Sequence, residues 1–196
     1  GLAAAYHLRR RGLRPGADFL VLDGNDGPGG AWRDRWDALT LDGTHAIHPL
    51  PGMPQPATDP TESANQAVPR YFASYEETFE LPIHRPVRVE SVEAVPSGGF
   101  RLATSEGVIL AGSVINATGT WNRPFVPTYP GLNTFEGLQV HARHYPGAAA
   151  FAGQSVLVVG FFFFCFVDNL DLHQGGATPI WSTRGIPRWT QTDFDA

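Results

Sequence analysis

Short apolar runs, separated by turns rich in glycine and proline, divide the chain into helical and extended segments. Over residues 1–12, small and apolar side chains precede arginines and a closing glycine, which predicts a helix. The apolar run 19–22 predicts a strand that ends at Asp23. Aromatic residues recur at helical intervals over residues 70–80 and predict a second helix, with Pro69 in its first turn.

Extended segments dominate the rest of the chain. Residues 87–95, 100–104 and 108–110 alternate between apolar and polar positions around tight turns, which predicts a three-stranded β-meander. The runs 113–119 and 155–160 are more continuously apolar, which is typical of parallel strands buried on both faces. We therefore expect an α/β chain.

The spacing of Gly1 and Asp23 indicates a nucleotide-binding unit. A helix that opens on glycine, followed by a strand that ends in an acid 22 positions later, is the back half of a dinucleotide-binding βαβ unit. Gly1 would be the third glycine of G-x-G-x-x-G, and Asp23 would accept hydrogen bonds from a ribose hydroxyl. The first strand and the first two glycines are absent, so we expect the chain to begin inside this motif.

Composition excludes several classes of function. The net charge is −5, and the 14 positive residues are all arginines that form no basic stripe, so nucleic acid is not expected as a partner. The single cysteine, Cys165, rules out an internal disulfide framework, a CxxC redox pair and a cysteine-rich metal site. The longest apolar run, 156–167, is too short to cross a bilayer, and no signal peptide is visible. We therefore expect a cytoplasmic protein without a membrane span or a metal site.

One spacing pattern resembles a known family. Residues 135–146 read F-x-G-x-x-x-H-x-x-x-Y-P, which resembles the fingerprint of flavin-containing monooxygenases. A GG-x-W loop after Asp23 and an A-T-G stretch after the meander also resemble this family. The resemblance implies two Rossmann-like dinucleotide-binding domains, both incomplete in this chain. Residues 1–124 would form part of the FAD domain, which contains the β-meander, and residues 125–196 would form part of the NADPH domain.

The resemblance also implies the site residues. No side chain is nominated as catalytic, because in this family the flavin carries the chemistry and the protein supplies orientation and excludes water. The candidate FAD-binding residues are Gly1, Asp23, Gly29, Gly30, Trp32, Arg33, Leu41, Ala117, Thr118 and Gly119. The candidate NADPH-binding residues are Gly160, Ser182 and Arg184, with Arg188 behind the last, and the family motif consists of Phe135, Gly137, His141 and Tyr145.

Two oxygenase activities, and also a protein without activity, are compatible with these motifs. NADPH would reduce FAD, O2 would add to the reduced flavin, and one oxygen atom would pass to a small substrate with a nucleophilic N or S atom or a carbonyl group. Tyr145 stands where Baeyer–Villiger relatives usually carry Trp, which favours an N- or S-oxygenating or auxin-pathway-like enzyme over a Baeyer–Villiger monooxygenase. The third alternative is an inactive or non-catalytic remnant, since Phe161 to Phe164 replace the glycine turn that would hold the NADPH pyrophosphate.

The phenylalanine run itself is compatible with a sequence or reading-frame error, with a decayed gene product, or with an apolar contact surface. We expect this 196-residue chain on its own to be inactive.

Overall fold

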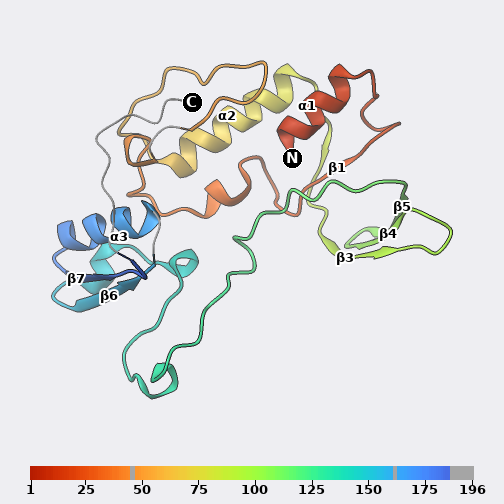
Figure 1. The fold of residues 1–196 in the computed structure, drawn as a ribbon. Coiled ribbons are helices and arrows are strands. Elements are labelled where there is room, and N and C mark those ends of the chain that lie inside the picture. The colour runs from red at the N-terminus through yellow and green to blue at the C-terminus, as the bar shows by residue number, and fades with distance from the viewer. Residues whose placement is uncertain (45–46, 161–162, 186–196) are drawn as a thin grey trace.

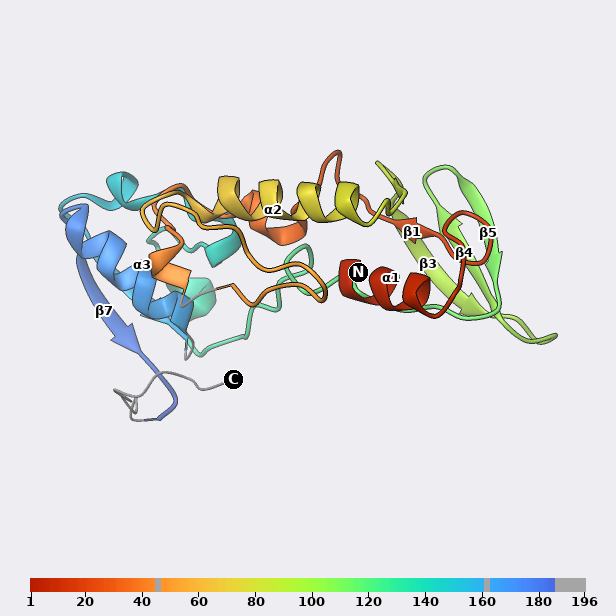
Figure 2. The same cartoon turned by 90° about the horizontal axis from the view of Figure 1, so that it is seen from above.

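The structure is a computed structural model of the chain and describes residues 1–44, 47–160 and 163–185. It is a mixed α/β arrangement in which small sheets and helices follow one another along an elongated molecule (Figures 1 and 2). The α-helices are α1 (Leu2–Arg10), α2 (Ala64–Thr78) and α3 (Phe163–Gln174). The strands are β1 (Val21–Leu22), β2 (Ile83–His84), β3 (Val89–Ala94), β4 (Phe100–Thr104), β5 (Gly107–Ala111), β6 (Ser155–Val159) and β7 (Thr178–Ser182). Short 3₁₀ helices are η1 (Gly30–Asp34), η2 (Asp42–Thr44), η3 (Leu132–Thr134), η4 (Ala142–His144) and η5 (Ala148–Phe151).

The N-terminal elements confirm the predicted helix and strand. Helix α1 starts directly after Gly1, and Gly12, which has a φ of +88°, lies just beyond its end. Helices α1 and α2 lie side by side in Figure 1, and Ala5 of α1 shares a buried core with Tyr75 of α2. Strand β1 pairs in parallel with β2, so the two strands end at the same edge of a small sheet.

Helix α2 begins earlier than predicted. Its N-cap is Ser63, and Pro69 lies inside the helix rather than in its first turn, so the predicted start was wrong. Pro69 cannot donate the backbone hydrogen bond that the helix interior normally makes. The first half of the helix nevertheless forms because Ala64 and Val68, both at most 1% exposed, pack in one core with Leu39. Burial of apolar surface offsets the missing hydrogen bond.

The β-meander is confirmed. Strands β3, β4 and β5 form an antiparallel sheet in sequence order, at one end of the molecule (Figure 2). The strand predicted at 113–119 is wrong, since these residues are assigned no strand and Ile115 is 62% exposed. A parallel strand exists only where a neighbour pairs with it. Among the described residues, no strand lies beside this segment.

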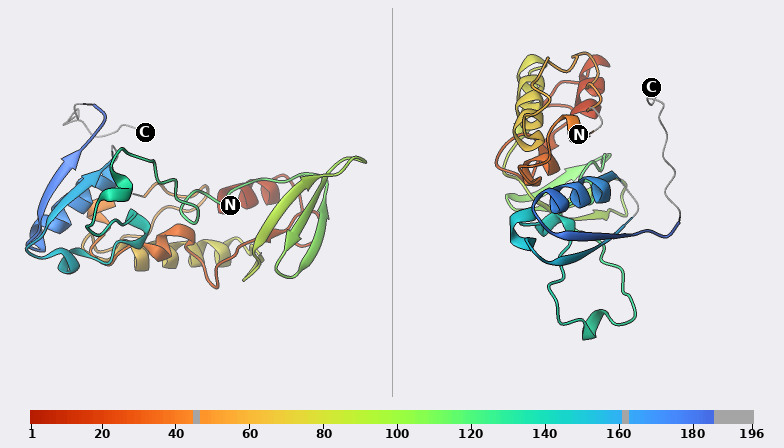
Figure 3. Two further views of the ribbon diagram at one scale, coloured as in Figure 1. Left: turned by 90° about the horizontal axis from the view of Figure 1, so that it is seen from below. Right: turned by 90° about the vertical axis from the view of Figure 1, so that its left-hand side faces the viewer.

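The C-terminal sheet forms a separate βαβ unit. Strands β6 and β7 pair in parallel, with α3 between them in sequence, at the end of the molecule opposite the meander (Figure 3). The predicted strand at 155–160 is confirmed, but its burial on both faces is not. One face packs against Phe151 and Leu172, whereas the other leaves Leu157 61% and Ile180 56% exposed. Within the described chain, no element covers that outer face. The β1–β2 pair and the β6–β7 pair are thus two distinct parallel sheets.

Candidate functional site

Asp23 lies at the carboxyl end of β1, where the sequence placed a ribose-binding acid. Its Oδ2 accepts a hydrogen bond from Arg85 Nε at 2.8 Å, and its Oδ1 accepts two from Asn25, at 3.1 Å from the backbone N and 2.8 Å from Nδ2. Its backbone is also tied to the neighbouring strand, since Asp23 N donates to His84 O at 3.0 Å. The carboxylate is therefore held in a defined orientation.

The start of α1 lies close to this carboxylate. Burial lowers the pKa of the Gly1 amino group, and the nearby negative charge of Asp23 partly offsets that effect. The end of a parallel strand and the N-terminus of a helix thus meet, as a nucleotide-binding βαβ unit requires. A Cβ atom added to Gly1 would meet no other atom within 4 Å.

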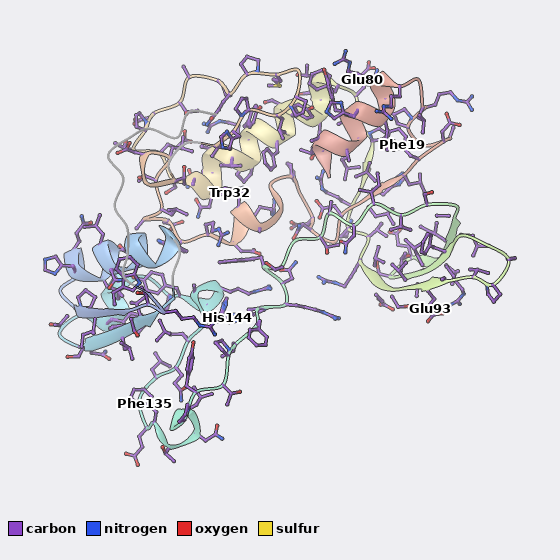
Figure 4. All side chains as sticks on the ribbon, viewed as in Figure 1. Phe19, Trp32, Glu80, Glu93, Phe135 and His144 are labelled. Atoms are coloured by element: carbon purple, nitrogen blue, oxygen red, sulfur yellow. The ribbon has the colours of Figure 1, made fainter. Side chains whose placement is uncertain are left out.

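The double-glycine loop packs against α2. Gly29 has a φ of +117°, and a Cβ atom there would lie 2.6 Å from Cγ of Pro69, so only glycine allows this close approach. Gly30, with a φ of +53°, faces open space instead. Trp32, labelled in Figure 4, is half-buried against the same core as Leu41, which is 8% exposed.

Arg33 is held within the loop that precedes it. Its guanidinium forms an ion pair with Asp26, and its Nη1 donates to the carbonyl oxygen of Pro28 at 3.3 Å. Among the predicted FAD residues, Gly29, Gly30, Trp32, Arg33 and Leu41 therefore come together around the start of α2 and the η1 helix.

An arginine–tryptophan stack connects this loop to the segment after the A-T-G stretch. The Arg35 guanidinium carbon lies 3.6 Å from the ring centroid of Trp121 and 5.7 Å from that of Trp32. Arg143 Nη1 donates to the carbonyl oxygen of Trp121 at 2.8 Å. Cationic and aromatic groups at these distances attract each other, so the stack fixes η1 relative to the segment around Trp121.

The predicted residues of the A-T-G stretch are exposed. The Thr118 backbone N and hydroxyl both donate to Asn116 Oδ1, at 3.1 and 2.8 Å, and Gly119 adopts a φ of +63°. Ala117 therefore lies in an exposed irregular segment that these local hydrogen bonds constrain.

The family motif spans two separate environments. Phe135 is 62% exposed at the end of a long loop, away from Trp32 and His144 in Figure 4. Its ring packs over Gly137, since a Cβ atom added there would lie 2.5 Å from Cε1 of Phe135. His141 and Tyr145 do not share a helix face but flank the short η4 helix. The structure therefore separates the first half of the motif from the second.

His141 and Tyr145 both have structural partners. The Nδ1 atom of His141 accepts a hydrogen bond from Arg143 N at 3.1 Å and so caps η4. Burial, followed by the nearby charges of His144 and Arg143, lowers the pKa of His141. Tyr145 donates its hydroxyl to Asp171 Oδ2 at 2.7 Å.

The Tyr145 ring joins two parts of the chain. It stacks on Phe151 with the ring planes at 9°, and it meets Trp36 edge-on at a centroid distance of 5.7 Å. Trp36 follows η1, whereas Asp171 lies in α3 and Phe151, the last residue of η5, packs in the core formed with β6 and α3. The aromatic contact therefore links the double-glycine loop to the C-terminal sheet.

The predicted NADPH residues lie at the carboxyl ends of β6 and β7. Gly160 N donates to Ser182 O at 3.0 Å, and Trp181 Nε1 donates to Gly160 O at 3.0 Å. Arg184 is exposed two residues beyond β7. The three predicted residues therefore lie at the same edge of the sheet, the edge at which ligands of parallel α/β sheets bind. Phe161, Phe162 and Arg188 lie outside the described residues.

Sequence reasoning missed Arg85 and Glu76 beside Asp23. No spacing pattern in the sequence indicated them, whereas in the structure the parallel register joins Val21 to Ile83 and Leu22 to His84. The next residues along, Asp23 and Arg85, are therefore neighbours. No group of acidic, histidine or cysteine side chains in the described ranges could hold a metal ion, and no helix there is long and apolar enough to span a membrane.

Comparison with known proteins adds independent information. A family model described as pyridine nucleotide-disulphide oxidoreductase matches residues 1–161. The structure is similar to a flavin-containing monooxygenase from Stenotrophomonas maltophilia, with 36% identity and a TM-score of 0.82, over 95% of this chain and 55% of that chain. The indole-3-pyruvate monooxygenase YUCCA1 of rice (Oryza sativa subsp. japonica) is 33% identical over 91% of this chain and 44% of its own length. A Baeyer-Villiger monooxygenase from Streptomyces coelicolor is 31% identical over 82% of this chain and 31% of its own length. The chain thus spans less than half of these two curated relatives.

Proposed function

Because the chain belongs to the pyridine nucleotide-disulphide oxidoreductase family, we propose that it is part of a flavin-dependent monooxygenase that uses FAD, NADPH and O2. The relatives described above support the oxygenase activity, since their names specify flavin-containing, indole-3-pyruvate and Baeyer-Villiger monooxygenases. The observation that carries the proposal is the position of Asp23, at the end of a parallel strand and close to the N-terminus of α1.

The residues around Asp23 fit FAD. The carboxylate would accept a hydrogen bond from a ribose hydroxyl, and the N-terminus of α1 would bind the adjoining phosphate. Gly30 leaves room for a flat ligand next to Trp32, and the exposed segment 117–119 would contribute backbone groups. We assign these residues to an FAD-binding part of the chain, residues 1–124.

The carboxyl ends of β6 and β7 fit a second nucleotide. Arg184 would hold the 2′-phosphate of NADPH, because a planar guanidinium binds phosphate oxygens through two parallel hydrogen bonds. Gly160 and Ser182 would lie against the rest of the nucleotide at the same edge of the sheet. We assign these residues to an NADPH-binding part, residues 125–196.

When bound, FAD would supply the redox chemistry of the reaction, with NADPH as the reductant and O2 as the oxidant, so that one oxygen atom enters a small-molecule substrate and the other leaves as water. The chain's residues bind and orient the two nucleotides. The Trp36–Tyr145 contact and the hydrogen bond from Arg143 to the carbonyl oxygen of Trp121 would hold the two nucleotide-binding parts against each other and exclude water between them. We propose a substrate with a nucleophilic N or S atom.

Two alternatives make different predictions. The similarity to the Streptomyces enzyme favours a ketone substrate, as in Baeyer–Villiger oxidation. The run from Phe161 to Phe164, where a glycine turn would hold the pyrophosphate, favours a non-catalytic protein that does not use NADPH.

The test uses the purified protein that contains this chain. We expect flavin absorbance in the visible range, and NADPH oxidation coupled to O2 uptake that increases with an amine or thioether. An increase with ketones instead would support the Baeyer–Villiger alternative. Flavin absorbance without NADPH oxidation would support the non-catalytic one. A protein that does not bind added FAD would refute the proposal.

A further inference from the structure

Asp23 belongs to a three-residue ion-pair network. Arg85, which follows β2, donates Nε to Asp23 Oδ2, and its two terminal nitrogens bind both carboxylate oxygens of Glu76, at 2.6 and 2.7 Å. The side chains of Arg85, Asp23 and Glu76 are 15%, 22% and 13% exposed. Because a bidentate pair is rigid, Glu76 fixes the plane of the guanidinium and therefore the direction of its Nε–H bond.

The hydrogen bonds leave one acceptor position on the Asp23 carboxylate. An ionised carboxylate offers about four lone-pair positions. Among the described residues, Asn25 occupies two of them on Oδ1, and Arg85 occupies one on Oδ2. The remaining position belongs to Oδ2, which is the oxygen that Arg85 holds.

We propose that the Glu76–Arg85 pair positions Asp23 for the cofactor, so that the open position of Oδ2 accepts a hydroxyl of the adenosine ribose of FAD. This inference rests on the proposed function and assigns a role to two residues that do not touch the ribose themselves. Arg85 is a positioning residue, and its effect on affinity acts through Asp23.

The charges of the network support this role. With Arg85 in place, the three side chains sum to −1, and the cation lies between the two carboxylates. Without Arg85, Asp23 and Glu76 would repel each other in a mostly buried site. Asp23 would then rotate toward solvent, and Oδ2 would lose its fixed direction.

The test compares the dissociation constants of FAD and of FAD analogues that lack one hydroxyl of the adenosine ribose. In the wild-type protein we expect FAD to bind more tightly than the deoxy analogue whose missing hydroxyl Asp23 accepts. Arg85→Met should weaken FAD binding by about tenfold, as for the loss of one well-oriented bond to a charged group, while the affinity for that analogue stays unchanged. Glu76→Gln should also weaken the binding of FAD and not that of the analogue, by less than tenfold. It provides the test if Arg85→Met does not fold.

Helix α2, which carries Glu76, also provides a matched control. Arg70 also forms a bidentate pair, with Glu62 at 2.7 Å for both bonds, but this pair is more exposed and does not include Asp23. Arg70→Met should leave both dissociation constants unchanged. Equal weakening of FAD and of both analogues by Arg85→Met, or no weakening, would overturn the positioning role while leaving the proposed function intact. A wild-type protein that does not bind FAD would instead refute the proposed function.

Discussion

Replacing Gly29 by alanine should destabilise the protein more than the same change at the adjacent Gly30. At Gly29, an alanine would be forced to a φ of +117°, far from the left-handed minimum near +57°, which costs about 1–3 kcal/mol. Its Cβ would also lie 2.6 and 2.8 Å from Cγ and Cβ of Pro69. Because a proline ring inside a helix cannot move aside, this contact adds about 1–3 kcal/mol, so the total is about 2–6 kcal/mol.

Gly30→Ala is the matched control. Its φ of +53° lies close to the left-handed minimum, and the new methyl group would meet no atom within 4 Å. The expected cost is therefore only the backbone term of about 1–2 kcal/mol. The two variants differ by one position in the chain, and the difference between them combines the backbone strain at Gly29 with the contact of the new methyl group with Pro69.

The assay is urea unfolding of both variants and the wild type, followed by tryptophan fluorescence. We expect equal slopes with urea concentration and a lower midpoint for Gly29→Ala. Adding Pro69→Ala to Gly29→Ala removes the Cγ atom and should recover about 1 kcal/mol beyond the effect of Pro69→Ala alone. Equal midpoints for the two glycine variants would refute the claim that Gly29 is needed for close packing on α2.

Three further predictions concern the family motif and the second nucleotide. Because the pKa of folded His141 is lowered, the unfolded chain binds the proton first as the pH falls below about 6.5, so the free energy of unfolding should decrease there. His141→Asn keeps an acceptor for the Arg143 N–H group, and it should make the free energy of unfolding from urea titrations depend less on pH. An unchanged pH dependence would show that His141 does not cause it. Tyr145→Phe should cost about 1.5 kcal/mol by losing its bond to Asp171, measured as a thermal midpoint, whereas Tyr129→Phe at a 46% exposed position should change nothing. Arg184→Ala should raise the KM for NADPH by about tenfold and leave that for NADH unchanged, and an equal rise for both would argue against phosphate binding.

The elements that the sequence predicted correctly depend on local patterns. Helix α1, the β-meander and strand β6 each contain their own periodicity and turn residues, so neighbours in sequence determine them. Helix α2 was placed too late because Pro69 is typical of a first turn, whereas the burial of Ala64 and Val68 against a distant loop determines where the helix begins. The segment 113–119 has the composition of a strand, but pairing with another strand decides whether it becomes one.

The candidate site likewise contains residues that spacing along the sequence indicates and residues that only the fold brings together. Asp23 could be identified because its distance from Gly1 is that of the helix and strand in the back half of a βαβ unit. Arg85 and Glu76 come from 62 and 53 positions farther along the chain, and only the parallel register of β1 and β2 brings Arg85 beside the acid. The contact of Trp36 with Tyr145 has no signal in spacing, since it depends on how the unit of β6 and β7 packs against η1.

That ring pair has a consequence for the order of assembly. Trp36 and Tyr145 are 109 positions apart (145 − 36), and the chain between them includes all of α2 and the meander. Closing so long a loop before its interior is ordered carries a large entropic cost, whereas the hairpins of β3, β4 and β5 join near neighbours. The hairpins should therefore form early in refolding, and the edge-on meeting of the indole and phenol rings should be among the last events.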